Sequence, residues 1–313
     1  MRRLWRRGWV SACMVWFGAV MTPTIVWAEH VADNGVHHDV AYGEHERQRF
    51  DWYPVPGASE PTPVVIYYHG GGFVRGDKDQ VSRRMIRRLQ ARGIGVASVN
   101  YRLADQAFLP APMYDGARAV QFLRHHADRF GLDPEAVAVS GTSAGAGIAL
   151  WVAFADDRAR PGSDDLVLRE SSRVSAVWVL DAQVSYDPAF WESRGLGGVV
   201  TDGKVRDLFG DMDGFAKFAV MSLIREASPI THVSAGDPPV RLDYRGSMGV
   251  TRSTSASALL HHPLHGSAFL EACQRVDVPC ELYYDGGPES RESVVDFLAG
   301  RLMEPEARGS HER

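Results

Sequence analysis

The stretch that most constrains this chain runs through residues 137–150, where a β-rich run meets the turn Gly141-Thr-Ser-Ala-Gly145 and continues as a helix of small residues. A sharp turn between a strand and a helix leaves little space for side chains, and it favours glycine at the flanking positions. Backbone strain there points the hydroxyl of Ser143 out of the sheet, beside the positive end of the helix dipole. A G-x-S-x-G pattern in this strand-turn-helix context predicts that Ser143 is a nucleophile.

A second motif, H-G-G-G-F beginning at His69, follows the apolar run 64–68, which predicts a buried strand. Three consecutive glycines leave backbone N–H groups bare, and such a loop can hold two of them toward a carbonyl oxygen. A phosphate-binding loop is disfavoured because no G-K-[ST] or G-x-G-x-x-G pattern follows. We therefore predict an oxyanion hole formed by the backbone N–H groups of Gly71, Gly72 and Ala144.

Together these motifs resemble the α/β-hydrolase fold, in particular the HGGG esterase/lipase branch related to hormone-sensitive lipase. Further matches follow in the order of that family: Asn100-Tyr-Arg-Leu103, Phe108-Leu-Pro-Ala-Pro112, Phe130-Gly-Leu-Asp-Pro134 and Ala227-Ser-Pro-Ile230. The resemblance implies an α/β protein with a mostly parallel central sheet flanked by helices, and a small cap insertion around residues 189–224. It also implies that Ser143 attacks a carboxylic ester, and it implies no metal and no organic cofactor.

The first 28 residues have the pattern of a secretory signal peptide. Four arginines precede an almost wholly apolar run, and the small residue Ala28 stands where cleavage is expected. That run is shorter than the roughly 20 residues needed to span a bilayer, so we expect no stable membrane anchor after cleavage. We expect export to the periplasm or the exterior, and a single α/β-hydrolase domain over residues 29–313, because no internal repeat interrupts the chain.

The charge balance limits the partners of this chain. The first 28 residues hold four of the 34 basic residues and none of the 39 acidic ones, so the remainder has a formal charge of −9. An acidic surface without a basic cluster argues against nucleic acid as a partner. The expected partner is a small-molecule or polysaccharide ester substrate.

Two cysteines lie close together in the sequence. Cys273 stands near the end of a predicted helix, and Cys280 stands at the start of the last predicted strand. An oxidising compartment would permit a disulfide between them, although the sequence does not fix the distance that a disulfide needs. The pairing therefore stays open.

The acid and the base of a serine triad are not where the family carries them. A serine nucleophile needs a base within hydrogen-bond reach, and the base needs an orienting acid. The family's acid follows the penultimate strand, yet residues 245–260 contain no Asp or Glu. Its base follows the last strand, and no histidine occurs between His265 and His311.

Three sets of residues could replace the missing base or acid of the triad. His261 or His262, after the penultimate strand, could act as the base, with His262 preferred because Pro263 restricts its backbone. Asp181 could be the acid, because it ends the predicted strand before the cap, where some hydrolases of this fold carry their acid. Glu289 could instead serve as a carboxylate base.

The missing triad residues also suggest an alternative function. A chain that lacks the standard His and Asp of the triad could be a degenerate α/β-hydrolase-fold protein. Such a protein would bind a glycan or acyl ligand with little or no turnover. A titratable histidine within reach of Ser143 distinguishes the two functions.

Overall fold

The computed structural model describes residues 30–32, 35–197, 199, 201–210, 216–251, 254–290 and 292–303, so the predicted signal peptide lies outside the described residues. Within these ranges one sheet of nine strands runs in the order β1-β2-β3-β5-β4-β6-β7-β8-β9. The strands are β1 (His30–Val31), β2 (His37–Ala41), β3 (Arg49–Tyr53), β4 (Thr62–Tyr68), β5 (Gly95–Val99), β6 (Leu132–Thr142), β7 (Ala176–Leu180), β8 (Val240–Asp243) and β9 (Cys280–Tyr283).

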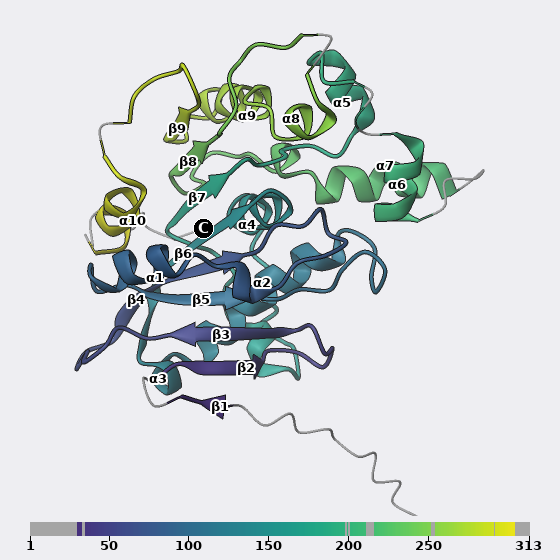
Figure 1. The fold of residues 1–313 in the computed structure, drawn as a ribbon. Helices are drawn as coiled ribbons and strands as arrows, with labels where there is room; N and C mark the ends of the chain where they lie inside the picture. The colour runs from purple at the N-terminus through teal and green to yellow at the C-terminus, as the bar shows by residue number, and fades with distance from the viewer. Residues whose placement is uncertain are drawn as a thin grey trace, which may run out of the picture.

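Helices lie on both faces of this sheet (Figure 1). They are α1 (Arg83–Gln90), α2 (Ala111–His125), α3 (Ala127–Phe130), α4 (Ala144–Phe154), α5 (Pro188–Ser193), α6 (Asp202–Phe209), α7 (Ala216–Ala227), α8 (Ala256–Leu260), α9 (Leu264–Gln274) and α10 (Val294–Met303), with the short 3-10 turns η1 (Lys78–Gln80), η2 (Leu166–Arg169) and η3 (Pro229–Thr231). The predicted α/β class, a mostly parallel sheet flanked by helices, is confirmed.

The central strands are parallel, and β4 and β5 are almost entirely buried. From β5 through β4, β6, β7 and β8 to β9 every pairing is parallel, whereas β1, β2 and β3 are joined to one another and to β5 in antiparallel fashion. Strand β4 divides its side chains between two cores. Val65 packs in the core that α1 and α10 cover, while Val64 and Ile66 pack in the core under α2 and α4. Burial on both faces explains the unbroken apolar run in its sequence.

Most expected elements are present with shifted ends. The sequence of residues 37–53 predicts two short antiparallel strands, and these are β2 and β3. The sequence of residues 114–129 predicts one helix, but the structure has two, because α2 ends at His125 and α3 follows. Helix α2 begins early, at Ala111, since Pro112 fits the first turn of a helix, where a missing N–H costs nothing. The described residues between 189 and 224 form α5, α6, most of α7 and the segments that flank these helices, beyond the end of β7 (Figure 1).

The two cysteines are free thiols that lie against each other. A hydrogen bond with Cys273, together with burial, raises the pKa of the Cys280 thiol. Across the described ranges, no helix is both long enough and apolar enough to pass through a membrane.

Candidate active site

Ser143 lies on a strained turn between β6 and α4. Its φ of 56° and ψ of −119° place a non-glycine residue in a region that costs about 1–3 kcal/mol. Its backbone N–H donates to the Leu180 carbonyl at 2.9 Å, which ties the turn to the end of β7. The hydroxyl is therefore presented at the carboxyl edge of the sheet, as the sequence motif predicts.

Both flanking glycines are needed because main chains touch here. A Cβ on Gly145 would lie 2.1 Å from the Tyr68 carbonyl oxygen, and one on Gly141 would lie 2.4 Å from the main chain of Gly145. These distances are far below any real carbon contact, and the neighbouring atoms belong to backbone that cannot swing away. The G-x-S-x-G spacing thus follows from close packing of β4, β6 and α4.

The glycine loop lies against the serine. A Cβ on Gly70 would come within 3.6 Å of the Ser143 Cβ, so the loop after β4 and the turn after β6 are in direct contact. Gly71 and Gly72 have φ values of 128° and 65°, which side chains rarely adopt. The N–H of Ala144 lies at the start of α4. The three predicted oxyanion donors therefore belong to two segments that meet at Ser143, and their role stays a prediction.

A histidine contacts the serine, and it is His261. The Oγ of Ser143 lies 2.9 Å from the Nε2 of His261, which is the capping residue at the C-terminal end of α8. The preference for His262 is corrected, because its ring points elsewhere. The Nδ1 of His262 accepts a hydrogen bond from the Leu264 N–H at 3.2 Å, and the ring also interacts with the backbone of Gly249.

The protonation of His261 is set by competing effects. Burial lowers its pKa below the ordinary value, and this is the largest effect. The charge of Asp181 and an interaction with the Ser257 backbone raise the pKa, while the charge of Arg245 lowers it. The net result is a neutral imidazole near neutral pH, which is the form that can accept a proton.

Asp181 is buried next to this pair, but another residue holds its carboxylate. Only 2% of Asp181 is exposed, and its φ of 56° is again left-handed. Its oxygens accept the backbone N–H of Arg245 at 3.0 Å and the Nε of Arg245 at 2.6 Å. No sequence motif predicts this role for Arg245, because the family pattern marks only an acid in the loop after the penultimate strand. The predicted acid therefore acts on His261 through its charge, and whether it orients the ring stays a prediction.

The other residues considered from the sequence do not contact Ser143. Glu289 is exposed in the segment after β9, and no hydrogen bond to Ser143 or His261 is present. His265 is buried against Trp191, with ring centroids 4.3 Å apart. Within the described residues, no group of three or more His, Cys, Asp and Glu side chains could hold a metal ion.

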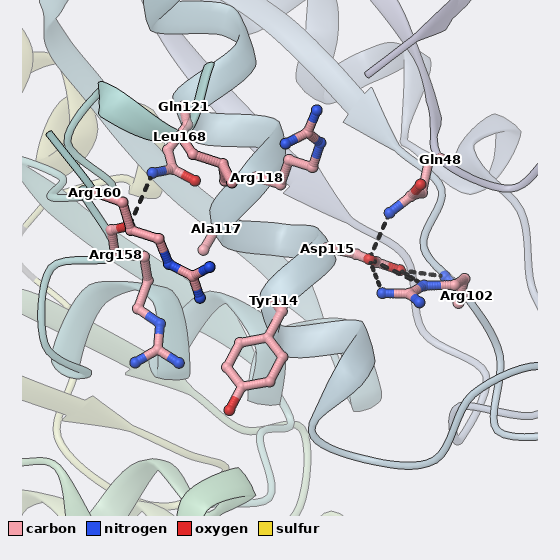
Figure 2. Close-up of a pocket in the computed structure, with 10 residues that line it drawn as sticks. All are labelled: Gln48, Arg102, Tyr114, Asp115, Ala117, Arg118, Gln121, Arg158, Arg160 and Leu168. Carbon is pink, nitrogen blue, oxygen red and sulfur yellow. Dashed lines mark hydrogen bonds and ion pairs between the residues drawn. The ribbon is translucent and has the colours of Figure 1, made fainter. Parts of the chain in front are cut away.

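A separate pocket lies beside α2 (Figure 2). Its cavity volume is about 150 Å³, and it is lined by Arg102, Asp115 and Arg118 among others. Its charges are largely paired. Arg102 binds Asp115 at 2.6 Å, and Arg118 binds Asp165 at 2.7 Å. Because neither Ser143 nor His261 lines it, this pocket is not the place where an ester would meet the serine.

The segment that carries these features matches a known protein family. Residues 50–263 match the family described as BD-FAE, and the match contains Ser143, Asp181 and His261. The chain belongs to the BD-FAE family. The predicted membership of an α/β-hydrolase esterase/lipase family is thereby confirmed.

Individual relatives of this BD-FAE chain agree with that assignment. It is 30% identical over 275 residues to the probable isoprenylcysteine alpha-carbonyl methylesterase ICMEL1 of Arabidopsis thaliana, covering 86% of this chain and 54% of that protein. The chain spans about half the length of the curated relatives that it matches.

Solved structures show the same fold at lower identity. The acetyl ester-xyloside bifunctional hydrolase from Caldicellulosiruptor lactoaceticus has a TM-score of 0.60 and 23% identity, over 79% of each chain. A truncated carbohydrate esterase from gut microbiota has a TM-score of 0.64 and 16% identity, over 87% of this chain and 99% of that one. At these identities the likeness supports the α/β-hydrolase fold alone.

Proposed function

We propose that this BD-FAE protein is a serine hydrolase that cleaves carboxylic esters through an acyl-enzyme on Ser143. The observation that carries the proposal is the 2.9 Å contact between Ser143 Oγ and His261 Nε2, on a turn whose backbone is held in the left-handed region. The names of its relatives, a methylesterase, an ester hydrolase and a carbohydrate esterase, support the same reaction class.

The chemistry follows from the protonation states. As Ser143 Oγ attacks the ester carbonyl, the neutral His261 accepts the hydroxyl proton at Nε2. Backbone N–H groups of Gly71, Gly72 and Ala144 hold the oxygen that becomes negative. The imidazolium then gives its proton to the departing alcohol, and a water activated by the same ring releases the acid. The buried charge of Asp181 stabilises the imidazolium while it exists.

The proposed substrates are small-molecule esters or acyl esters on a polysaccharide. One solved structure with this fold is described as a carbohydrate esterase and another as an acetyl ester-xyloside bifunctional hydrolase, which favours an acylated sugar. The alternative, a degenerate hydrolase-fold protein that binds without turnover, rests on the absence of a base. His261 beside Ser143 weakens that premise.

Turnover of a simple ester tests the proposal. Purified protein should hydrolyse p-nitrophenyl acetate, and Ser143→Ala should lower kcat by about 10⁴-fold or more. Ser140→Ala, a buried serine on the same strand, serves as the control for loss of a hydroxyl. Equal background rates for wild type and Ser143→Ala would instead favour the binding protein.

We also propose export, with cleavage after Ala28. Expression of the full sequence in a bacterium should give a mature protein that begins at Glu29 and lies outside the cytoplasm. N-terminal sequencing of the fractionated protein measures this directly. A chain that retains Met1 and stays in the cytoplasm would rule the signal peptide out.

A further inference from the structure

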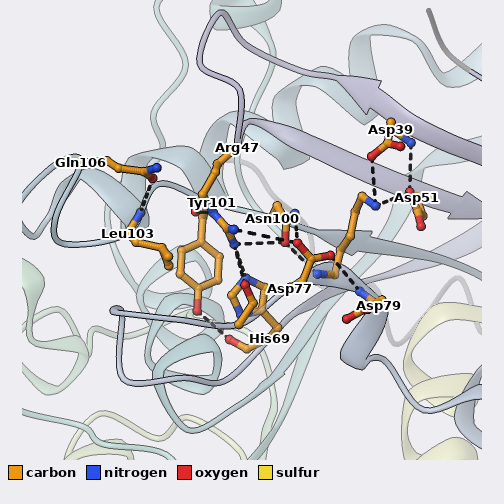
Figure 3. Close-up of polar contacts among 12 residues, drawn as sticks. Asp39, Arg47, Asp51, His69, Asp77, Asp79, Asn100, Tyr101, Leu103 and Gln106 are labelled. Carbon is orange, nitrogen blue, oxygen red and sulfur yellow. Dashed lines mark hydrogen bonds and ion pairs between the residues drawn. The ribbon is translucent and has the colours of Figure 1, made fainter. Parts of the chain in front are cut away.

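The guanidinium of Arg47 joins the two ends of the glycine loop, which we define as residues 69–76 (Figure 3). Its Nη2 lies 3.1 Å from the Nε2 of His69 and donates to the Gly76 carbonyl at 2.8 Å. Its Nε donates to the Tyr101 carbonyl at 3.0 Å. The side chain is only 17% exposed. One partly buried cation therefore contacts both the first and the last residue of the loop.

These contacts fix which ring nitrogen of His69 carries the proton. The Nδ1 of His69 lies 2.7 Å from the Gly70 carbonyl, which can only accept a hydrogen bond. Arg47, at the other nitrogen, can only donate. The neutral ring must therefore carry its proton on Nδ1 and present a lone pair at Nε2. Burial, and to a smaller extent the charge of Arg47, lower the pKa of His69 to about 4, so the ring stays neutral at working pH.

The same hydrogen bond sets the direction of a predicted oxyanion donor. In a trans peptide the carbonyl and the N–H that share the bond point in opposite directions. Because the Gly70 carbonyl is turned toward the His69 ring, the N–H of Gly71 is turned to the other side of the peptide plane. Gly70 itself lies against Ser143. The chain of contacts from Arg47 through His69 thus ends at the Gly71 N–H, a predicted oxyanion donor in the peptide that follows Gly70.

Other groups keep Arg47 in place. Asn100 accepts a hydrogen bond from Arg47 Nη2 at 3.3 Å and from the Lys78 N–H at 2.7 Å, and its amide donates to Asp77 at 2.8 Å. Asp77 in turn lies 3.8 Å from Arg47 Nη1. With its orientation fixed by neighbours on two elements, the guanidinium is preorganised, so little reordering is needed during a reaction.

We propose that Arg47 is a positioning residue for the proposed esterase, which fixes the tautomer of His69 and through it the Gly70–Gly71 peptide that faces the oxyanion. Arg47 contacts neither Ser143 nor His261, so its effect reaches the reaction only through the loop. The inference rests on the proposed function of the site. It adds a residue outside both sequence motifs to the machinery.

The test compares Arg47→Gln, whose amide can donate to or accept from the His69 ring, and Arg47→Ala with Arg118→Ala. Arg118 is the matched control, because it is also partly buried and also binds a backbone carbonyl and an aspartate, Tyr42 and Asp165, but it does not contact the loop. Loss of one oxyanion donor costs about 10²–10³-fold in kcat. We therefore expect kcat for p-nitrophenyl acetate to fall by about 10- to 100-fold in both Arg47 variants, with KM nearly unchanged, and Arg118→Ala to keep wild-type kcat.

A spectroscopic readout separates positioning from mere folding. Nitrogen-15 NMR of the His69 ring should show the Nδ1–H tautomer alone in wild type and in Arg118→Ala, and a mixture of tautomers in Arg47→Ala. Added ethylguanidinium should restore part of the kcat of Arg47→Ala. If Arg47→Ala does not fold, Arg47→Gln decides by its kcat and by the tautomer of His69, because its amide does not force the Nδ1–H tautomer.

The outcomes separate this inference from the proposed function. Wild-type kcat and an unchanged tautomer in the Arg47 variants would overturn the inference, even if Ser143→Ala abolishes turnover. If wild type and Ser143→Ala are equally inactive, the proposed function fails, and the tautomer alone decides whether Arg47 positions the loop.

Discussion

The two sides of the candidate site are built in different ways. The serine side consists of residues 69–76 and 141–145, where main chains of β4, β6 and α4 touch. The histidine side consists of Asp181, Arg245 and residues 256–265, where side chains from three loops meet. Close backbone contact admits only glycine, so the serine side leaves a local motif in the sequence. Side-chain contact admits many partners, so the histidine side leaves none.

Separate alanine substitutions of the two neighbouring histidines should give the largest effect on the histidine side. His261→Ala removes the proposed base and should lower kcat by about 10⁴-fold, while His262→Ala should leave kcat within a few-fold of wild type. The two residues are adjacent, so each variant is the control for the other. Steady-state kinetics on p-nitrophenyl acetate measures both, and equal losses in two folded variants would mean that the contact with Ser143 is not used.

A glycine substitution should test the backbone origin of the serine side. Gly145→Ala places a Cβ 2.1 Å from the Tyr68 carbonyl and should lower the free energy of unfolding by about 2–3 kcal/mol. Gly300→Ala, in α10, meets nothing within 4 Å and should raise it by about 0.5–1 kcal/mol. Urea denaturation measures both changes. Similar stabilities for the two variants would show that the close approach in β4 and α4 relaxes freely.

On the histidine side, His265 should make stability depend on pH. Burial, with smaller contributions from His262 and His261, lowers its pKa to about 3, and neither ring nitrogen has a hydrogen-bond partner within the described residues. The unfolded chain takes up the proton near pH 6.5, whereas the folded one does not, so stability falls as the pH drops below that value. Between pH 7 and pH 5 the loss should be about 2 kcal/mol.

His265→Leu should remove this part of the dependence. Leucine fits an apolar site beside Trp191 and binds no proton, so the difference in unfolding free energy between pH 7 and pH 5 should shrink by about the same 2 kcal/mol. Thermal and urea unfolding at the two pH values measure this difference. If the loss of unfolding free energy between pH 7 and pH 5 is the same in His265→Leu as in wild type, groups other than His265 cause it.

The smallest expected effects are opposite shifts in the pH profile of kcat/KM. Arg245 lowers the pKa of His261, so Arg245→Gln should raise that pKa and move the acidic limb to higher pH. Asp181 raises the pKa of His261, so Asp181→Asn should move the limb to lower pH. A shift in the same direction for both variants would contradict the charge assignment.

The contrast also explains what the sequence could predict. The fold class, the strained turn that carries Ser143 and the two glycine loops follow from apolar runs and glycine spacing, which report local packing. The choice between His261 and His262 does not, because Pro263 restricts the backbone of His262 without aiming its ring. The ring is turned to the Leu264 N–H instead. The pairing of Arg245 with Asp181 joins residues 64 positions apart, so no local pattern reports it.

The position of His261 separates the proposed catalytic residues from the last elements of the described chain. The proposed nucleophile, acid and base all lie between residues 143 and 261, ahead of α9, β9 and α10. The later elements still matter, because Phe297 and Leu298 pack under the sheet. Libraries that randomise the exposed positions of α10 should therefore yield many active variants, whereas the same mutation rate in α8 should yield few. For directed evolution of substrate range, the final helix is a safe place to diversify and to attach a surface anchor.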